Sequence, residues 1–109
     1  MVDIIVLNLI IVTIKVWILS VFVHELAHIL YYRWRVGKFP TVWIEDWAIC
    51  VGTPHQVNKL KPLHRREFYI AGVISGLLCY TLLPVPLLGA VASIPYLLGC
   101  SWDFKRFCE

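Results

Sequence analysis

His24 and His28 stand four residues apart, and Glu25 follows the first of them, in the sequence His-Glu-Leu-Ala-His. On a helix, two side chains at this spacing lie one turn apart on the same face, so both imidazoles can bind one tetrahedral Zn²⁺. Glu25 can then reach the open coordination position and take a proton from zinc-bound water. The motif therefore predicts a zinc centre with His24 and His28 as ligands and Glu25 as the general base.

The composition indicates that the helix carrying this motif lies in a membrane. Of the 109 residues, 60% are hydrophobic and 16% are charged, and the mean hydropathy is +0.75. A chain of this size buries too small a share of its surface to hide so much apolar area from water. We therefore expect one domain, residues 1–109, with the lipid bilayer as its solvent.

The first apolar segment covers residues 4–32, and its most lipid-compatible part runs from Val16 to Tyr32, between Lys15 and Arg33. Those residues form a helix of roughly 25 Å, enough to cross a thin bilayer. If the span began at Ile4 instead, Lys15 would lie within the hydrocarbon, which is costly. No basic segment precedes this run, so we expect it to be retained as a span and not cleaved as a signal peptide.

Two further apolar segments, residues 68–83 and 87–102, flank Pro84 and Pro86, which predict a helix break and hence an antiparallel hairpin. Residues 41–51 are rich in β-branched and aromatic side chains, which predicts a strand or small hairpin between the first and second helices. The expected fold class is membrane all-α, with about three transmembrane helices and one small β element.

Nine of the ten Lys and Arg residues lie at the ends of the apolar segments. They are Arg33, Arg35, Lys38, Lys59, Lys61, Arg65, Arg66, Lys105 and Arg106. This distribution fits the positive-inside rule better than a nucleic-acid surface. We therefore expect a multi-pass protein of the cell membrane that binds no nucleic acid and has its active site toward the cytoplasm.

A catalytic zinc needs a third protein ligand, and the topology favours Asp103. His28 lies five residues before Arg33 and Asp103 lies three before Arg106, so both are expected at similar depth below the same membrane face. The other candidates, which stay open, are Asp3, Glu45, Asp46, His55, His64, Glu67 and Glu109. In the second apolar segment, Gly72 and Gly76 form a small-residue face that lets another helix approach closely.

Taken together, these features resemble the site-2 protease family of intramembrane zinc metalloproteases. In that family, a three-helix core carries HExxH on its first helix, a small β element follows, and a later helix supplies an aspartate as the third zinc ligand. The matching positions here are residues 24–28, residues 41–51, Ala71-Gly72 and Asp103. The chain differs in having Val73 where the family often has proline, and in the residues around Asp103. The resemblance implies a minimal core of this family.

The resulting hypothesis is an endopeptidase that hydrolyses peptide bonds of transmembrane or membrane-proximal proteins, with Glu25 acting on zinc-bound water. Two alternatives from other classes stay open: a metal-binding membrane protein without hydrolytic activity, and a partner that holds another membrane protein. A soluble metallopeptidase with Glu45 as ligand is disfavoured by the hydropathy. The sequence predicts neither the substrate nor the oligomeric state.

Overall fold

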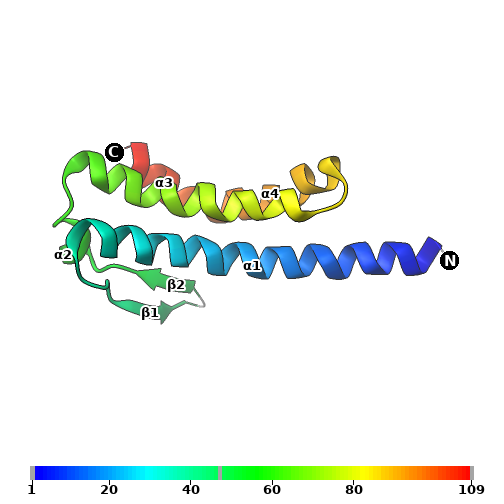
Figure 1. Ribbon diagram of the computed structural model, residues 1–109, viewed down its shortest axis with the longest axis horizontal. Coiled ribbons are helices and arrows are strands. Elements are labelled where there is room, and N and C mark those ends of the chain that lie inside the picture. Colours follow the sequence, from blue (N-terminus) through cyan, green and yellow to red (C-terminus); the bar gives the residue numbers. More distant parts are fainter. Residues whose placement is uncertain (1, 47, 109) are drawn as a thin grey trace.

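The computed structural model describes residues 2–46 and 48–108 and shows a mostly helical chain (Figure 1). In these ranges the helices are α1 (Val2–Val36), α2 (Pro54–Val57), α3 (Pro62–Leu78), α4 (Pro86–Gly99) and α5 (Ser101–Cys108), with a 3₁₀ turn, η1 (Cys79–Leu82), after α3. Strands β1 (Val42–Glu45) and β2 (Ala48–Val51) lie between α1 and α2. The long helices run side by side along a molecule that measures 55 × 24 × 24 Å.

Helix α1 is unbroken through Lys15 and, with 35 residues, is roughly 52 Å long. It ends where Gly37 adopts a φ of 86° and donates its backbone N–H to the carbonyl of Arg33, a left-handed cap that glycine favours. Among the described residues, α1 is the one helix long and apolar enough to cross a membrane. Only 11% of its most apolar 18-residue window is buried, so the rest of the chain leaves most of this surface uncovered.

The predicted hairpin of the later helices is present, but its boundaries differ from those expected. α3 begins at Pro62 rather than Phe68, because proline is well tolerated in the first turn of a helix. α4 ends at Gly99, so Trp102 lies in the separate helix α5. With 14 residues, α4 is roughly 21 Å long, shorter than the hydrocarbon layer of an average bilayer.

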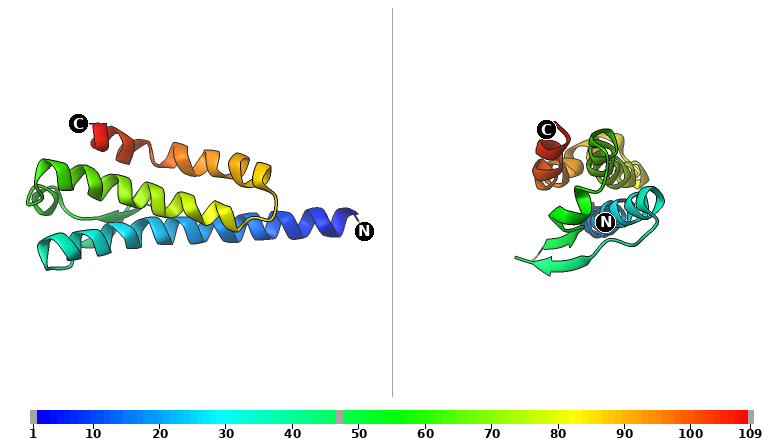
Figure 2. Two further views of the ribbon diagram at one scale, coloured as in Figure 1. Left: turned by 45° about the horizontal axis from the view of Figure 1, so that its top comes forward. Right: turned by 90° about the vertical axis from the view of Figure 1, so that its left-hand side faces the viewer.

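Packing holds this hairpin to the middle and the end of α1. Near the η1 turn, the indole N–H of Trp17 donates to the carbonyl of Ala92 at 2.7 Å. A buried apolar cluster surrounds this contact, formed by Val16, Val73, Cys79, Tyr80, Leu83, Ala92, Tyr96 and Cys100. At the other end, Tyr32 packs with Val57, Leu60 and Phe68. The hairpin therefore covers α1 from Val16 to Tyr32, and the earlier part of α1 projects beyond it (Figures 1 and 2).

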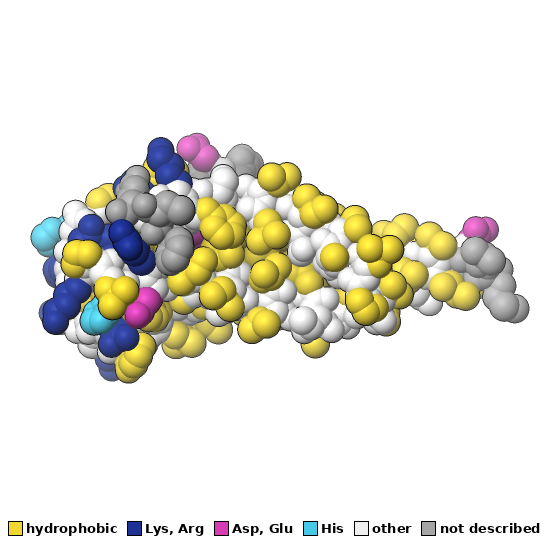
Figure 3. All heavy atoms as spheres, turned by 90° about the horizontal axis from the view of Figure 1, so that it is seen from above, with side chains coloured by type: hydrophobic (Ala, Val, Ile, Leu, Met, Phe, Trp, Pro, Cys, Tyr) yellow, Lys and Arg dark blue, Asp and Glu magenta, His cyan; other side chains and the backbone are white. Residues whose placement is uncertain are grey.

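The predicted β element is confirmed as an antiparallel hairpin of β1 and β2, in which Glu45 pairs with Ala48 and Val42 with Val51. Asp46 has a φ of 50°, as the short loop of such a hairpin requires. The sheet lies on the side of α1 away from α4 (Figures 1 and 2). Lys, Arg and His side chains gather at the same end of the molecule, whereas hydrophobic side chains dominate the rest of the face in Figure 3.

Candidate metal centre

The structure brings His24 and His28 of α1 together with Asp103 of α5. The Nε2 atoms of the two imidazoles lie 3.0 Å apart. Asp103 Oδ2 lies 2.7 Å from Nε2 of His24 and 3.3 Å from Nε2 of His28. Both imidazoles are buried. Two imidazole nitrogens of α1 and one carboxylate oxygen of α5 thus lie within 3.3 Å of one another, and all three are atom types that bind zinc.

The remaining nitrogen of each imidazole is held by a hydrogen bond. Nδ1 of His28 lies 2.8 Å from the carbonyl oxygen of Phe68, which can only accept, so Nδ1 carries the proton. Nδ1 of His24 lies 2.9 Å from the hydroxyl of Tyr96, and that hydroxyl donates to the backbone carbonyls of Gly72 and Val73. With Nδ1 protonated, the lone pair of each ring is on Nε2, the arrangement of metal-binding histidines.

A break between α4 and α5 places Asp103 in this cluster. Cys100 ends α4 with a φ of −87° and a ψ of 7°, and α5 starts at the next residue. Burial raises the pKa of the Asp103 carboxyl, but when the imidazoles of His24 and His28 also carry a proton on Nε2, their hydrogen bonds to the carboxylate outweigh this effect and lower its pKa to about 2. The carboxylate is therefore charged at neutral pH, as a metal ligand must be.

The spacing of these atoms fits a tetrahedral metal ion. Zinc bound to nitrogen and oxygen at its usual distances separates neighbouring ligand atoms by roughly 3.3 Å. The three separations here, 2.7, 3.0 and 3.3 Å, reach this value with shifts of a few tenths of an ångström. Net charge also fits, because two neutral imidazoles and one carboxylate suit a divalent cation.

A second set of donors overlaps the first. Atoms of His24, Cys100 and Asp103 lie within 4.8 Å of one another and could also hold a metal ion. However, the Cys100 thiol approaches His24 on the Nδ1 side of the ring, at 3.7 Å, where Tyr96 already bonds. The described residues thus contain a possible metal-binding group, and the shortest separations there include those from Asp103 Oδ2 to Nε2 of His24 and of His28.

Glu25 lies beside this group and lines an adjoining cleft. One of its carboxylate oxygens is 4.0 Å from Nε2 of His24, and its side chain is 18% exposed. The cleft has a volume of about 650 Å³ and opens between the metal-binding group, β2 and the first turns of α3. A carboxylate in this place can reach both a water molecule and a peptide group in the cleft.

The other candidate ligands lie elsewhere in the described structure. Glu67 bonds to the hydroxyl of Tyr31 and, at 3.3 Å, to Arg35. Glu45 accepts from the indole of Trp43. In the described ranges, Asp3, Asp46, His55 and His64 do not join the metal-binding group. Glu109 lies outside the described residues.

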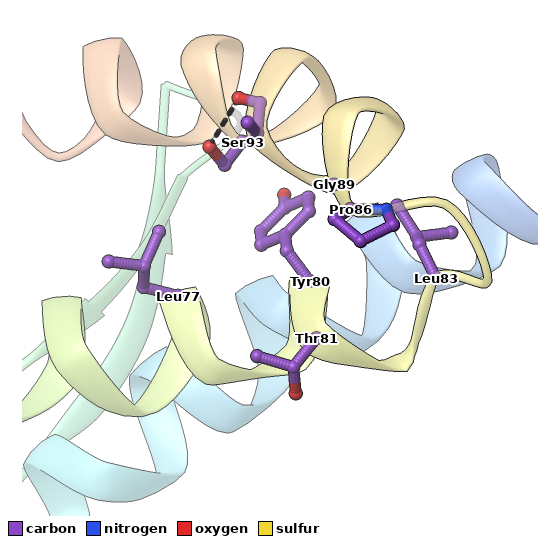
Figure 4. Close-up of a pocket in the computed structure, with 8 residues that line it drawn as sticks. Leu77, Tyr80, Thr81, Leu83, Pro86, Gly89 and Ser93 are labelled. Carbon is purple, nitrogen blue, oxygen red and sulfur yellow. Dashed lines mark hydrogen bonds between the residues drawn. The ribbon is translucent and has the colours of Figure 1, made fainter.

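A further hollow, of about 410 Å³, lies at the turn between η1 and α4 (Figure 4). Its lining is mainly apolar, with hydroxyls from Tyr80, Thr81 and Ser93, and Ser93 donates to the carbonyl of Ala90. Among these described lining residues there is no carboxylate, imidazole or thiol. Hydroxyl groups are therefore the side-chain polar groups that the described lining of this hollow offers, and they do not make a zinc-binding set.

Sequence reasoning did not identify Tyr96 as part of the site. The signal was present, since a phenolic hydroxyl in an apolar helix must find a hydrogen-bond partner, and Tyr96 lies one helical turn before Cys100.

Comparison of the chain with protein-family models, curated proteins and solved structures gave no match.

Proposed function

We propose that this chain is an intramembrane zinc metalloprotease with the minimal core of the site-2 protease family. The observation that carries the proposal is the convergence of His24 Nε2, His28 Nε2 and Asp103 Oδ2 within 3.3 Å, with Nδ1 of each ring already bonded. Glu25 stands beside these atoms at the wall of a cleft. Zinc is the metal that this donor set and HExxH spacing suit best.

We place three segments in the membrane: α1, α3 continued by η1, and α4. The exposed aliphatic and aromatic side chains of α1, such as Phe22 at 61% and Leu26 at 50%, support this placement, because lipid is the solvent in which they are stable. The part of α1 that the hairpin covers is roughly 25 Å long, so the short α4 implies a thin or locally thinned bilayer. The basic end would face the cytoplasm and the protein would be multi-pass.

In the proposed reaction, a water molecule is added across a peptide bond. Bound zinc supplies Lewis acidity to the water and to the scissile carbonyl. Glu25 takes a proton from the water as its oxygen bonds to the carbonyl carbon, and passes that proton to the amine as the carbon–nitrogen bond breaks. His24, His28 and Asp103 would hold the metal, and the hydrogen bonds at Nδ1 of His24 and of His28 fix both rings.

A substrate helix must unwind before its backbone can reach Glu25, since helical peptide bonds are shielded. β2 lines the cleft and is one strand of a two-stranded sheet. An extended substrate segment could add to this sheet and lie beside the general base. The partners that follow from this mechanism are a transmembrane or membrane-proximal protein substrate and the bilayer.

Metal analysis and peptide cleavage on the detergent-purified chain test the proposal. Glu25→Gln should keep one zinc per chain and lose cleavage of a transmembrane peptide, because the amide cannot accept the proton. His24→Ala should lose both zinc and cleavage. Cleavage retained by Glu25→Gln would refute the assigned role. Stoichiometric zinc in a wild-type chain that cleaves no transmembrane peptide would favour the alternative of a metal-binding protein without hydrolytic activity.

A further inference from the structure

A row of aliphatic side chains on α1 leads along the helix to the proposed general base. Its members recur at steps of three and four residues, the spacing that keeps side chains on one face of a helix. The row, named the α1 stripe here, consists of Ile4, Leu7, Ile11, Ile14, Ile18 and Val21. Glu25 and His28 occupy the next two positions of the same spacing. The stripe therefore ends at the candidate metal centre.

The described structure leaves the α1 stripe uncovered. Its six side chains are between 41% and 63% exposed. The buried residues Val16 and Ser20 each lie two positions from Ile18, which puts them roughly on the opposite side of α1, against the hairpin of the later helices. The polar side chains of Asn8 and Lys15 flank the stripe and do not interrupt it. The stripe is therefore a continuous aliphatic surface.

The α1 stripe, continued to Glu25, is as long as a membrane span. The helix from Ile4 to Glu25 measures roughly 32 Å, and the hydrocarbon layer of a typical bilayer is about 30 Å thick. Among the described helices, α1 is the one long and apolar enough to cross a membrane, and it extends beyond the hairpin (Figure 1). A second transmembrane helix laid along the stripe would contact α1 over its whole apolar length and reach Glu25 at one end.

The residue types of the stripe suit packing against another helix. Aliphatic side chains at alternating steps of three and four residues are the pattern by which two helices interlock. In lipid, such contacts drive helix association through close packing. Five of the six residues are Ile or Val, whose side chains have one strongly preferred rotamer in a helix. Docking a partner therefore costs these side chains little conformational freedom.

A second copy of the chain fits the stripe poorly. Two copies inserted with the same topology would pack their α1 helices in parallel, so equal positions of the repeat would face each other. Glu25 would then oppose Glu25 of the second copy, and like charges placed together at an interface are strongly unfavourable. A substrate helix carries no such acid in its apolar segment.

We propose that the α1 stripe docks the transmembrane helix of the substrate and delivers its cytoplasmic end to Glu25. The inference rests on the proposed proteolytic function and names its substrate class: membrane proteins whose apolar helix continues for several turns on the non-cytoplasmic side of the scissile bond. Beyond Val21 the docked helix reaches the cleft that Glu25 and β2 line, where it can unwind. The stripe thus holds the helical part of the substrate while the cleft receives the extended part.

Neighbouring positions of α1 provide matched variants for a binding test. Ile18→Trp and Ile11→Trp enlarge stripe residues, whereas Leu19→Trp and Val12→Trp enlarge exposed residues at the same depth, about 100° away around the helix. All four keep the surface apolar and touch no proposed metal ligand, so zinc content should stay at the wild-type value. In a Glu25→Gln background, reconstituted in neutral lipid, a labelled transmembrane peptide is titrated against each variant. The stripe variants should bind it at least about fivefold more weakly, because the enlarged side chains no longer fit the docked helix.

Equal affinities within both pairs would mean that lipid alone covers the stripe, and would overturn the inference. Self-association of the wild type that Ile18→Trp abolishes and Leu19→Trp keeps would show that the stripe joins two copies, and would also overturn it. Unchanged oligomeric state in all four variants, together with weaker peptide binding in the stripe variants, would support the docking site.

A short peptide separates this inference from the proposed function. It contains the scissile segment and the cytoplasmic flank of the transmembrane peptide, without the apolar helix. With an intact Glu25, Ile18→Trp should lower kcat/KM about fivefold for the long peptide and leave it unchanged for the short one. Equal kcat/KM values in Ile18→Trp and Leu19→Trp for both peptides would overturn the docking site and leave the protease intact. Stripe-dependent binding by a chain that cleaves neither peptide would refute only the protease.

Discussion

Gly72 of α3 faces the imidazole of His28 so closely that a Cβ atom at position 72 would lie 2.5 Å from His28 Nε2. Real Cβ atoms essentially never make such a contact, so any side chain at this position must displace the ring. The atom displaced is the one that we expect to bind zinc. The small residues on this face of α3 therefore leave room for the imidazole of His28, in addition to letting the helices pack closely.

Gly72→Ala should accordingly lower zinc affinity by at least tenfold, because His28 cannot keep its position beside His24 and Asp103. Titration with a competing zinc chelator measures this. Gly99→Ala is the control, since a Cβ at position 99 would meet nothing within 4 Å. Wild-type zinc affinity in Gly72→Ala would show that His28 binds the metal from another position or not at all.

Tyr96 is expected to position His24 without touching the metal. Tyr96→Phe removes the hydroxyl that lies 2.9 Å from Nδ1 of His24, and loss of such a partner typically costs 10–100-fold in metal affinity. Tyr80→Phe is the matched control, because Tyr80 is also a buried tyrosine and its hydroxyl bonds to Ser20 instead.

Tyr80→Phe should lose about 1 kcal/mol of unfolding free energy, as expected for one buried hydrogen bond, and Tyr96→Phe should lose more, because its hydroxyl bonds to His24, Gly72 and Val73. Only Tyr96→Phe should lose zinc affinity, and isothermal titration of both proteins checks this. Equal zinc affinities in the two variants would contradict the positioning role.

The two overlapping donor sets make opposite predictions. If zinc binds at the Nε2 atoms, Asp103→Ala should lose most of the bound zinc and Cys100→Ser should keep it. If the thiol is a ligand instead, Cys100→Ser should lose zinc, since a hydroxyl binds it far more weakly than a thiolate. Metal analysis of the purified variants decides between them, and zinc retained by Asp103→Ala would return the search for the third ligand to the other carboxylates and histidines.

The parts of the site that depend on local spacing could be predicted from the sequence. Two histidines one turn apart must share a face of any helix, and the structure shows them 3.0 Å apart. The break at Cys100 was not predicted, although Gly99 and Ser101 on either side of it are residue types that favour helix ends. That break creates α5 and brings Asp103 to 2.7 Å from His24. The role of Asp103 as a zinc ligand stays a prediction.

Long-range contacts account for most of what the sequence could not supply. Tyr96 is hydrogen-bonded to His24, which lies 72 residues away in the sequence, and the residues around Tyr96 do not indicate this partner. From the sequence, Arg65, Arg66 and Arg106 were interpreted as topology signals. The packing of α3 on α5 shows that all three line one cleft. Helix α1 continues through Lys15 instead of beginning after it. Lysine has a good helix propensity, and a charged side chain does not interrupt the backbone hydrogen bonds of a helix.

The membrane placement can be tested at one exposed position of α1. Phe22 is 61% exposed and lies midway along the stretch that the hairpin covers. If Phe22 faces water, Phe22→Arg replaces one exposed side chain by another and should change the free energy of unfolding by no more than about 0.5 kcal/mol. At the centre of a bilayer the same arginine costs about 2.5–3.5 kcal/mol, so we expect Phe22→Arg to reduce sharply the fraction of the protein that resists alkaline extraction from membranes. Ile44→Arg, on β1 and 76% exposed, should leave that fraction unchanged. Equal membrane retention of both variants would mean that α1 does not face lipid at Phe22.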